Sequence, residues 1–380
     1  MEIPIAKPYI GKEEELSVSR VLSSGWVSQG PEVVKFEHDF MNYVGAEYAC
    51  AVSSCTAGLH LALLSLGVKP GDEVITVSHS FIATANAILY CGAKPVFIDI
   101  DKKTFNIDVD KIVKRITTKT KCILCVHQMG MPCNLKKILS IAKKYSLYVI
   151  EDAACSLGSE ILWEKEWVKI GKPIGDIVCF SFHPRKIITT GDGGMVTTSI
   201  KEIDTKLRLL RQHYMGVPDT DRHSSKKIIF ESYDGLGYNY RLTDIQAAIG
   251  IEQLKKIDKI ILKRRLLSDR YKDLLSVIDG LILPHEPNNV KSNWQSFCVY
   301  LPKGINQKEA MQYLLDRGIS TRRGIMCAHK EKTYRQNTEK VSLKNSEFAQ
   351  ENSILLPLFV QMTKNEQDYV VDKLREVCGK

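Results

Sequence analysis

A single lysine, Lys186, lies in a loop between two apolar runs, residues 177–182 and 195–198, which we expect to be buried strands. Serine, threonine and glycine surround the lysine, and the loop ends in a Gly-Asp-Gly-Gly turn. Lysine normally lies on a solvated face. When it is held in a cleft, desolvation lowers its pKa and its amine can attack carbonyl carbons, which indicates Schiff-base chemistry. On this stretch alone, a solvated loop lysine is the commoner alternative.

An aspartate, Asp152, ends another apolar run, residues 147–152, and small residues follow it. A carboxylate at the bottom of a cleft needs a cationic partner, and a protonated heterocyclic nitrogen is one such partner. The alternative is a structural aspartate that caps the next turn. Before Lys186 is considered, the two interpretations carry equal weight.

A run of small hydroxyl and thiol residues, 53–56, joins an apolar strand to a helix predicted over residues 57–66. Free backbone amides and hydroxyl groups at a helix N-terminus form a ready site for an anion or a phosphate. An ordinary Ser/Thr N-cap is the commoner explanation of the same pattern.

From residue 73 onward, apolar strands alternate with helices as far as residue 152. This alternation predicts an α/β fold with a mostly parallel sheet covered by helices on both faces. Ligands of such sheets bind beyond the carboxyl ends of the strands. The residues that fall at these ends are Phe81, His127, Gln128, Glu151 and Asp152.

The length of 380 residues exceeds what one compact core usually organises, so two domains are expected. Residues 1–250 are predicted to form the large domain. It includes an amphipathic helix over 12–24, with Leu16, Val21 and Leu22 apolar, and a second helix over 31–43. A long helix from Thr243 to about Leu275 is predicted to link this domain to a smaller one, so that residues 251–380 hold the linking helix and the small domain. In the helix predicted over residues 31–43 and at its end, the residues expected to point inward are Val33, Phe36, Phe40 and Val44.

Composition excludes several classes of protein. The net charge of +9 is modest and scattered, which suits an anionic small substrate and is weak evidence for nucleic acid. The eleven cysteines have no zinc spacing, and most lie in apolar runs as expected for buried thiols. No apolar run approaches the roughly 18 residues of a membrane helix, and the first residues lack the apolar core of a signal peptide. We expect a cytoplasmic protein with no membrane or nucleic-acid partner and no metal.

Five segments occur in an order that resembles a known family. They are SSCTAGLHLAL, FIATANAILYCGAKPVFIDID, VIEDAACSLGS, CFSFHPRKIITTGDGGMVTT and GYNYRLTDIQAAIGIEQL. Together they resemble the DegT/DnrJ/EryC1/StrS family of sugar aminotransferases, which depend on pyridoxal 5′-phosphate (PLP). The likeness runs from about Pro8 to the C-terminus. It implies a fold type I aminotransferase that works as a homodimer with active sites at the subunit interface.

The resemblance also implies roles for individual residues. Lys186 would form the internal aldimine with the cofactor, Asp152 would pair with the pyridine nitrogen, and the ring of Phe81 would stack on the pyridine. The phosphate would lie at Cys55 and Thr56, with Ser181 reaching it, and Asn239 would arrive from the partner subunit, with Tyr240 and Arg241 at the same interface. On the substrate side the segment around His329 matches, and Trp26 and Arg241 are further candidates for substrate contacts.

Several positions depart from the family pattern. Cys55 stands where glycine is frequent, and Asp192 stands where the family usually has glutamate. Cys155, a candidate cofactor contact, stands where histidine or glutamine is common. Met326 replaces a frequent histidine. The change at Cys155 bears on a polar contact to the cofactor, whereas the change at Met326 bears on the sugar-contacting side of the pocket and not on the cofactor side.

The resemblance implies transfer of an amino group from an amino acid, usually L-glutamate, to a keto sugar, mostly a nucleotide-linked 4-keto-6-deoxy hexose, for surface polysaccharide or glycoconjugate synthesis. A 3-keto sugar or a small phosphorylated ketone are alternative acceptors. A PLP-dependent sugar dehydratase is disfavoured because Lys186 is present, where the dehydratases that resemble this family have histidine. A regulatory, DNA-binding protein is the non-enzymatic alternative, and the sequence shows no convincing helix-turn-helix or basic stripe for it.

Overall fold

The computed structural model describes residues 1–217, 228, 230–337 and 341–379. Its centre is a seven-stranded sheet with the strand order β1-β9-β8-β5-β4-β2-β3. The strands are β1 (Tyr48–Val52), β2 (Glu73–Val77), β3 (Lys94–Ile98), β4 (Thr120–Val126), β5 (Tyr148–Asp152), β8 (Ile177–Ser181) and β9 (Gly194–Thr198). Only β9 runs antiparallel to its neighbours within this described sheet. The predicted α/β class with a mostly parallel sheet is therefore confirmed.

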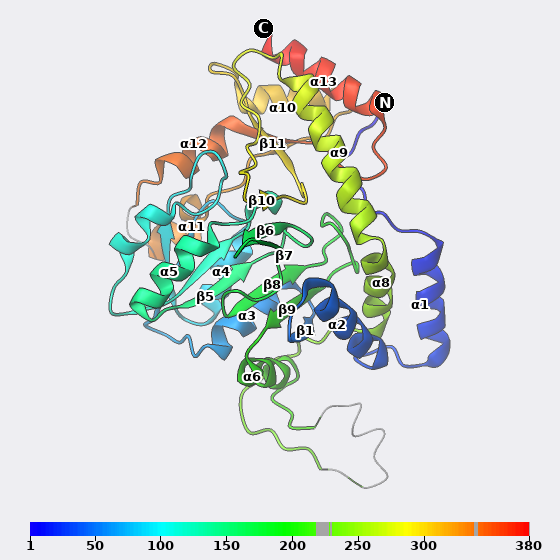
Figure 1. Cartoon of the computed structure of the whole chain (residues 1–380), viewed down its shortest axis with the longest axis vertical. Helices are drawn as coiled ribbons and strands as arrows, with labels where there is room; N and C mark the ends of the chain where they lie inside the picture. Colours follow the sequence, from blue (N-terminus) through cyan, green and yellow to red (C-terminus); the bar gives the residue numbers. More distant parts are fainter. Residues whose placement is uncertain (218–227, 229, 338–340, 380) are drawn as a thin grey trace.

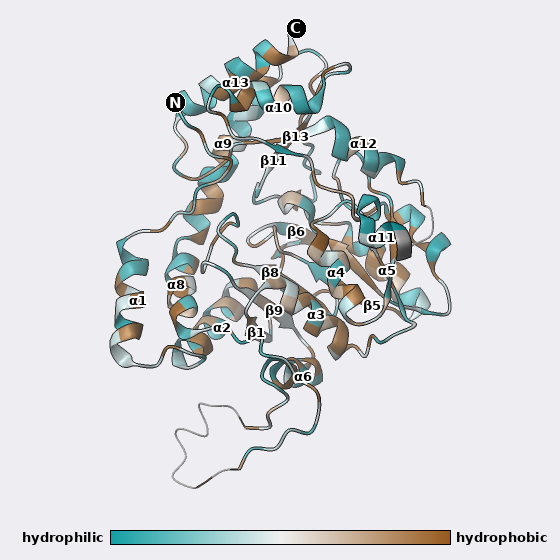
Figure 2. Ribbon diagram, turned by 180° about the vertical axis from the view of Figure 1, so that it is seen from behind, coloured by the Kyte–Doolittle hydropathy of each residue, from teal (hydrophilic) through white to brown (hydrophobic). Residues whose placement is uncertain are grey.

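Five helices in the described part of the chain, most of which follow a strand, pack against this sheet (Figure 1). They are α2 (Pro31–Val44), α3 (Cys55–Ser65), α4 (Ile82–Tyr90), α5 (Leu135–Tyr145) and α6 (Lys201–Arg211). Helix α3 contacts β8 and β9, whereas α5 contacts β4 and β5. Hydrophobic residues follow the central strands and the helices against them (Figure 2). Between β3 and β4 the alternation predicts a helix, but the chain forms a pair of 3₁₀ turns there, η1 (Val109–Lys111) and η2 (Val113–Arg115).

An aromatic cluster joins α2 to the end of β8. Phe36 and Phe40 are fully buried, as the spacing of apolar residues predicted for this helix. The ring centroid of Phe40 lies 5.1 Å from that of Phe180 and 5.7 Å from that of Phe182. Since Phe182 is the first residue after β8, this cluster anchors the start of the loop that carries Lys186.

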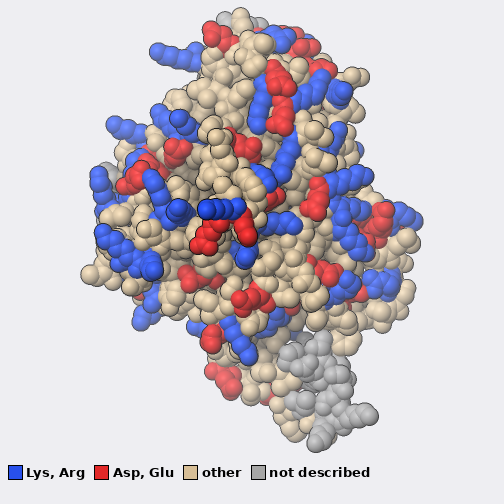
Figure 3. Space-filling model, in the orientation of Figure 1, with Lys and Arg blue, Asp and Glu red and all other residues tan. Residues whose placement is uncertain are grey.

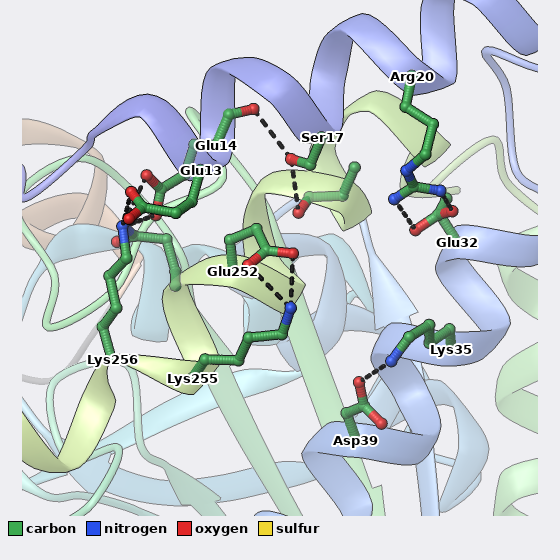
Figure 4. A network of polar contacts seen from close by, with 12 residues as sticks. Glu13, Glu14, Ser17, Arg20, Glu32, Lys35, Asp39, Glu252, Lys255 and Lys256 are labelled. Atoms are coloured by element: carbon green, nitrogen blue, oxygen red, sulfur yellow. Dashed lines mark hydrogen bonds and ion pairs between the residues drawn. The ribbon is translucent and has the colours of Figure 1, made fainter.

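Helix α1 (Lys12–Ser24) forms where predicted, but polar groups fix it to the rest of the molecule. Leu16 and Leu22 are mostly exposed, and Val21 is the only one of its three apolar candidates that is buried. Buried Glu14 instead accepts hydrogen bonds from Lys256 at 2.8 Å and from Gln253 at 2.7 Å (Figure 4). The amphipathic pattern predicted the helix, whereas long-range polar contacts determine how it docks.

The predicted long linking helix is interrupted at Lys256, which separates α8 (Asp244–Lys255) from α9 (Ile257–Leu275). Thr243 caps α8, as expected: its hydroxyl accepts the backbone N–H of Gln246 at 3.2 Å. The first turns of α9 belong to the core of the large sheet, and its last turns belong to a second hydrophobic core. Figure 1 shows α9 running from α8 to the part of the molecule where both termini lie.

The second core surrounds a small antiparallel sheet of β11 (Phe297–Tyr300), β13 (Ser353–Leu356) and β12 (Arg322–Arg323). Helices α10 (Gln307–Leu315) and α13 (Lys364–Cys378) pack against this sheet and each other, and the N-terminal residue Ile3 joins the same core. The remaining elements of this part are η4 (Ala328–Lys330), α11 (Lys332–Asn337) and α12 (Lys344–Asn352). The proposed division near residue 250 stays a prediction.

A third sheet was not predicted. It consists of β10 (Val290–Lys291), β6 (Glu160–Trp163) and β7 (Glu166–Lys169), and it brings residues 289–295 against the loop that follows β5. A short 3₁₀ turn, η3 (Gln128–Gly130), follows β4. Within the described residues, no helix is long and apolar enough to cross a membrane.

Candidate active site

A cavity of about 680 Å³ lies beyond the carboxyl ends of β4, β5 and β8. The ends of these strands and the first turns of α3 and α4 form one side of it, and β12 with the N-terminal residues Ile5 and Ala6 form the other. Six of the predicted cofactor residues and the predicted catalytic lysine line this cavity. They are Cys55, Thr56, Phe81, Asp152, Cys155, Ser181 and Lys186.

Hydrogen bonds within the loop 182–193 place Lys186. The backbone N–H groups of Phe182 and Thr190 bond to the carbonyl oxygens of Gly193 and Phe182, at 2.9 and 3.0 Å. The hydroxyl of Thr189 donates a further bond, at 2.7 Å, to the carbonyl oxygen of Phe182. The two threonines therefore close the loop on the anchored residue Phe182. Lys186 is left with its Nζ inside the cavity, 3.1 Å from the sulfur of Cys155.

The pKa of Lys186 differs from the expectation. Burial lowers it, as predicted, but Cys155, Cys55 and Asp152 act in the opposite direction, and the net effect is a raised pKa. The expectation of a lysine with a lowered pKa is therefore wrong for this protein without a cofactor. The ammonium form is favoured, and the amine must lose its proton before it can attack a carbonyl carbon.

Asp152, at the end of β5, is a buried carboxyl with fixed geometry. Its Oδ2 accepts a hydrogen bond from the hydroxyl of Thr84 at 2.7 Å, and its Oδ1 accepts one from the N–H of Ala154 at 3.1 Å. Burial raises the pKa of Asp152, and these two bonds oppose that effect. Within the described part of the chain, no cationic side chain forms an ion pair with it. A cationic ring nitrogen in the cavity would supply that missing counter-charge.

The start of α3 provides an anion site on the same cavity. Ser54 caps the helix by accepting the N–H of Ala57 at 3.1 Å, whereas the N–H groups of Cys55 and Thr56 bond to no described residue. A Cβ at Gly194 would lie 2.7 Å from the nitrogen of Cys55, so only glycine lets β9 approach this helix end. The exposed amides and the partial positive charge of the helix end suit a phosphate.

Phe81 immediately precedes α4 and lines the cavity with a ring that is 64% exposed. Thr84, which holds Asp152, lies in the first turn of the same helix. One helix start therefore supplies both an aromatic face and the partner of the buried carboxyl. Thr84 was not predicted from the sequence, because its role depends on a contact with a residue 68 positions away.

The other predicted site residues lie outside this cavity. The indole of Trp26 donates to the carbonyl oxygen of Gln29 at 3.1 Å, and Asn239 accepts a bond from Arg241 at 3.1 Å in the loop before α8. His329 pairs with the hydroxyl of Ser78 at 2.6 Å and with Glu347 at 3.2 Å. None of these four residues is among the described residues that line the cavity of this chain. Their roles in binding stay predictions.

The outer part of the cavity is cationic. Arg185, Arg322 and Arg323 line it and are exposed. Among the described residues, none of the three guanidinium groups has an ion-pair or hydrogen-bond partner. Arg322 and Arg323 begin the segment 322–330, which ends next to His329 and was predicted to face a substrate, whereas Arg185 and the neighbouring Gln295 were not identified.

PLP has three polar groups for which this cavity holds partners. Its aldehyde can react with a lysine amine, its ring nitrogen can pair with a carboxylate, and its phosphate can bind at a helix N-terminus. Its flat ring also needs an apolar face, which Phe81 supplies. The fold and the residues present therefore fit a PLP enzyme of fold type I.

The chain belongs to the DegT/DnrJ/EryC1/StrS aminotransferase family, whose pattern it matches over residues 8–375. It is therefore a PLP-dependent aminotransferase. It is 40% identical to the uncharacterized protein MJ1066 of Methanocaldococcus jannaschii, with 99% of this chain and 98% of that protein covered. It is 36% identical to the spore coat polysaccharide biosynthesis protein SpsC of Bacillus subtilis, with 99% and 97% covered.

A solved structure has a fold very similar to that of this chain. The putative sugar aminotransferase Spr1654 of Streptococcus pneumoniae, in its PLP form, superposes with a TM-score of 0.91 at 25% identity. The alignment covers 100% of this chain and 99% of that one. The likeness therefore extends over both hydrophobic cores and over the cavity between the large sheet and β12.

Proposed function

We propose that this aminotransferase moves an amino group from L-glutamate to a keto sugar, most simply a nucleotide-linked 4-keto-6-deoxy hexose, for polysaccharide or glycoconjugate synthesis. The observation that carries the proposal is one cavity lined by Lys186 and buried Asp152 and, where it is exposed, by three arginines whose guanidinium groups have no partner among the described residues. The buried groups form the inner end and suit the cofactor, and the exposed arginines form the outer end and suit an anionic acceptor. The similarity to SpsC and Spr1654 supports a sugar as that acceptor.

The residues around the inner end would have distinct tasks. Asp152 would hold the ring nitrogen of the cofactor, while Cys55, Thr56 and Ser181 would bind its phosphate and Phe81 would pack on its ring. The bound cofactor supplies an electron sink for the carbon that loses a proton. Lys186 would hold the cofactor covalently and, once displaced by the donor's amine, would move the proton from the donor's α-carbon.

The outer end of the cavity favours an anionic acceptor. Arg185, Arg322 and Arg323 place three positive charges there, and the acidic lining residues are Asp152 and Asp192. Guanidinium groups bind phosphate oxygens in a bidentate manner, so a nucleotide diphosphate would suit them. A small phosphorylated ketone would use the same charges and is the second candidate acceptor.

We propose a homodimer in which residues around Asn239 reach the partner's cavity. In this chain, Asn239 and Arg241 bond to each other outside the cavity. On the same connection, Phe230 is 89% and Leu236 is 80% exposed, and a second copy would cover such apolar side chains. Size measurement in solution tests the dimer.

We also propose that the enzyme works in the cytoplasm without a nucleic-acid or membrane partner. All eleven cysteines are free thiols, which suits a reducing compartment. On the face drawn in Figure 3, lysines and arginines are mixed with aspartates and glutamates, in contrast to the concentrated basic face of a nucleic-acid-binding protein.

The proposed reaction can be tested with its two halves separated. Adding L-glutamate to the PLP form should replace the visible absorbance of lysine-bound cofactor by that of pyridoxamine phosphate, with release of 2-oxoglutarate. Nucleotide-linked 4-keto sugars, 3-keto sugars and small phosphorylated ketones are then added separately to the aminated enzyme. Return of the visible band with the first class only is the expected result. Return with phosphorylated ketones alone would overturn the sugar assignment.

A further inference from the structure

The amine of Lys186 has one hydrogen-bond partner among the described residues, and that partner is the thiol of Cys155. The Nζ donates to Sγ over 3.1 Å. Both side chains line the cavity. This contact therefore decides where the amine lies in the protein when it is not bonded to the cofactor.

The backbone that carries Cys155 is fixed independently of Lys186. The carboxamide of Asn293 donates to the carbonyl oxygens of Cys155 and Leu157, each at 2.9 Å. On the other side, the N–H of Ala154 bonds to Asp152. The thiol is thus presented to the cavity by a loop whose position does not depend on the lysine.

The same segment also holds the loop of Lys186. Gln295, two residues after Asn293, donates from its Nε2 to the carbonyl oxygen of Arg185, the residue before Lys186. The N–H of Gln295 in turn bonds to the Oδ1 of Asn293 at 2.8 Å. Residues 293–295 therefore clamp both sides of the Cys155–Lys186 contact.

We propose that Cys155 is a positioning residue for Lys186, whose thiol holds the amine whenever the amine is free of the cofactor. This happens before the cofactor is captured and again during each turnover, when the donor has displaced the lysine. The inference rests on the proposed role of Lys186.

The contact has a consequence for proton transfer. The groups that act on the charge of Lys186 are Cys155, Cys55 at the start of α3, and Asp152 at the end of β5, and together they raise its pKa against the effect of burial. Cys155 has the largest effect of the three and is the one that accepts a hydrogen bond from the amine. Removing the Cys155 thiol should therefore lower the pKa of Lys186.

The test measures how fast the cofactor-free enzyme captures PLP. The rate is taken from the appearance of the visible absorbance band and is measured across a range of pH. Capture should accelerate with pH until the amine is deprotonated and then reach a plateau. Cys155→Ala should lower the plateau rate by about three- to tenfold, since one hydrogen bond is lost, and should move the midpoint to lower pH. Cys155→Ser, which keeps an acceptor, should restore the plateau rate to within about twofold of the parent. Cys378→Ala, in α13, is the matched control and should match the parent.

Two outcomes would overturn the proposal. One is a Cys155→Ala variant with the plateau and midpoint of the parent. The other is equal slowing in Cys155→Ala and Cys155→Ser, which would show that the sulfur acts by packing alone. Lys186→Ala separates this inference from the proposed function. If Lys186→Ala still develops the visible band, the lysine itself is wrongly assigned, whatever the cysteine variants do.

Discussion

The two ends of the cavity are built differently. At the inner end, Asp152 is held by two hydrogen bonds, and the loop of Lys186 is closed on the buried residue Phe182. At the outer end, Arg322 and Arg323 are exposed, and their guanidinium groups have no polar partner among the described residues. The inner groups belong to the core of the large sheet, whereas β12 belongs to the small one.

This difference suggests a division of labour. Groups that act on a cofactor meet the same chemistry in every turnover, so fixing them in advance reduces the reorganisation needed during the reaction. Long arginine side chains at the rim can adapt to the phosphates of an acceptor, but ordering them costs conformational entropy on binding. Changes at the inner end should therefore alter rates, and changes at the outer end should alter affinity for the acceptor.

The largest effect is expected at Asp152. Replacing it with asparagine keeps its size but removes the charge that would stabilise a protonated ring nitrogen. The rate of the half-reaction with L-glutamate should fall by about a hundredfold to a thousandfold, measured by loss of the visible band in stopped flow. Asp279→Asn, at an exposed turn, is the charge-matched control. If the half-reaction rate of Asp152→Asn stayed within a few-fold of the parent, the charge of Asp152 would have no part in the reaction.

A smaller effect, of a different kind, is expected at the rim. Arg322→Ala and Arg323→Ala should each raise the KM for an anionic acceptor by about tenfold, as expected for loss of one charge-assisted hydrogen bond. The half-reaction with L-glutamate should keep its rate, because Arg322 and Arg323 lie on β12 of the small sheet, whereas Asp152 lies on β5 of the large sheet. Lys303→Ala, at an exposed turn after β11, controls for net charge. Equal losses in both half-reactions would contradict the proposed division between the two ends.

Much of the fold was predictable because its strands are short apolar runs and its helices have apolar stripes. The direction of β9 and the sheet of β6, β7 and β10 were not, since pairing of short, partly exposed strands depends on distant partners. For α1, the apolar residues Leu16 and Leu22 face solvent, and a contact from Glu14 to Lys256 fixes the helix instead. Periodicity alone does not contain that contact.

The candidate site shows the same limit. Lys186 and Asp152 could be selected from the sequence because each follows an apolar strand at the edge where ligands bind. The supporting contacts could not, because Thr84 and Asn293 lie far along the chain from the residues they hold. The raised pKa of Lys186 is a further case, since it depends on a thiol and a carboxyl brought close only by folding.

The most direct test of the central claim is to identify the residue that carries the cofactor. The PLP form is reduced with borohydride, which makes the bond between lysine and cofactor permanent, and its peptides are mapped by mass spectrometry. Lys201→Ala, at an exposed position on α6, serves as the control variant and should be labelled like the parent. The account predicts phosphopyridoxyl label on Lys186 alone and none on that peptide in Lys186→Ala. Label on a different lysine in the parent enzyme would contradict it.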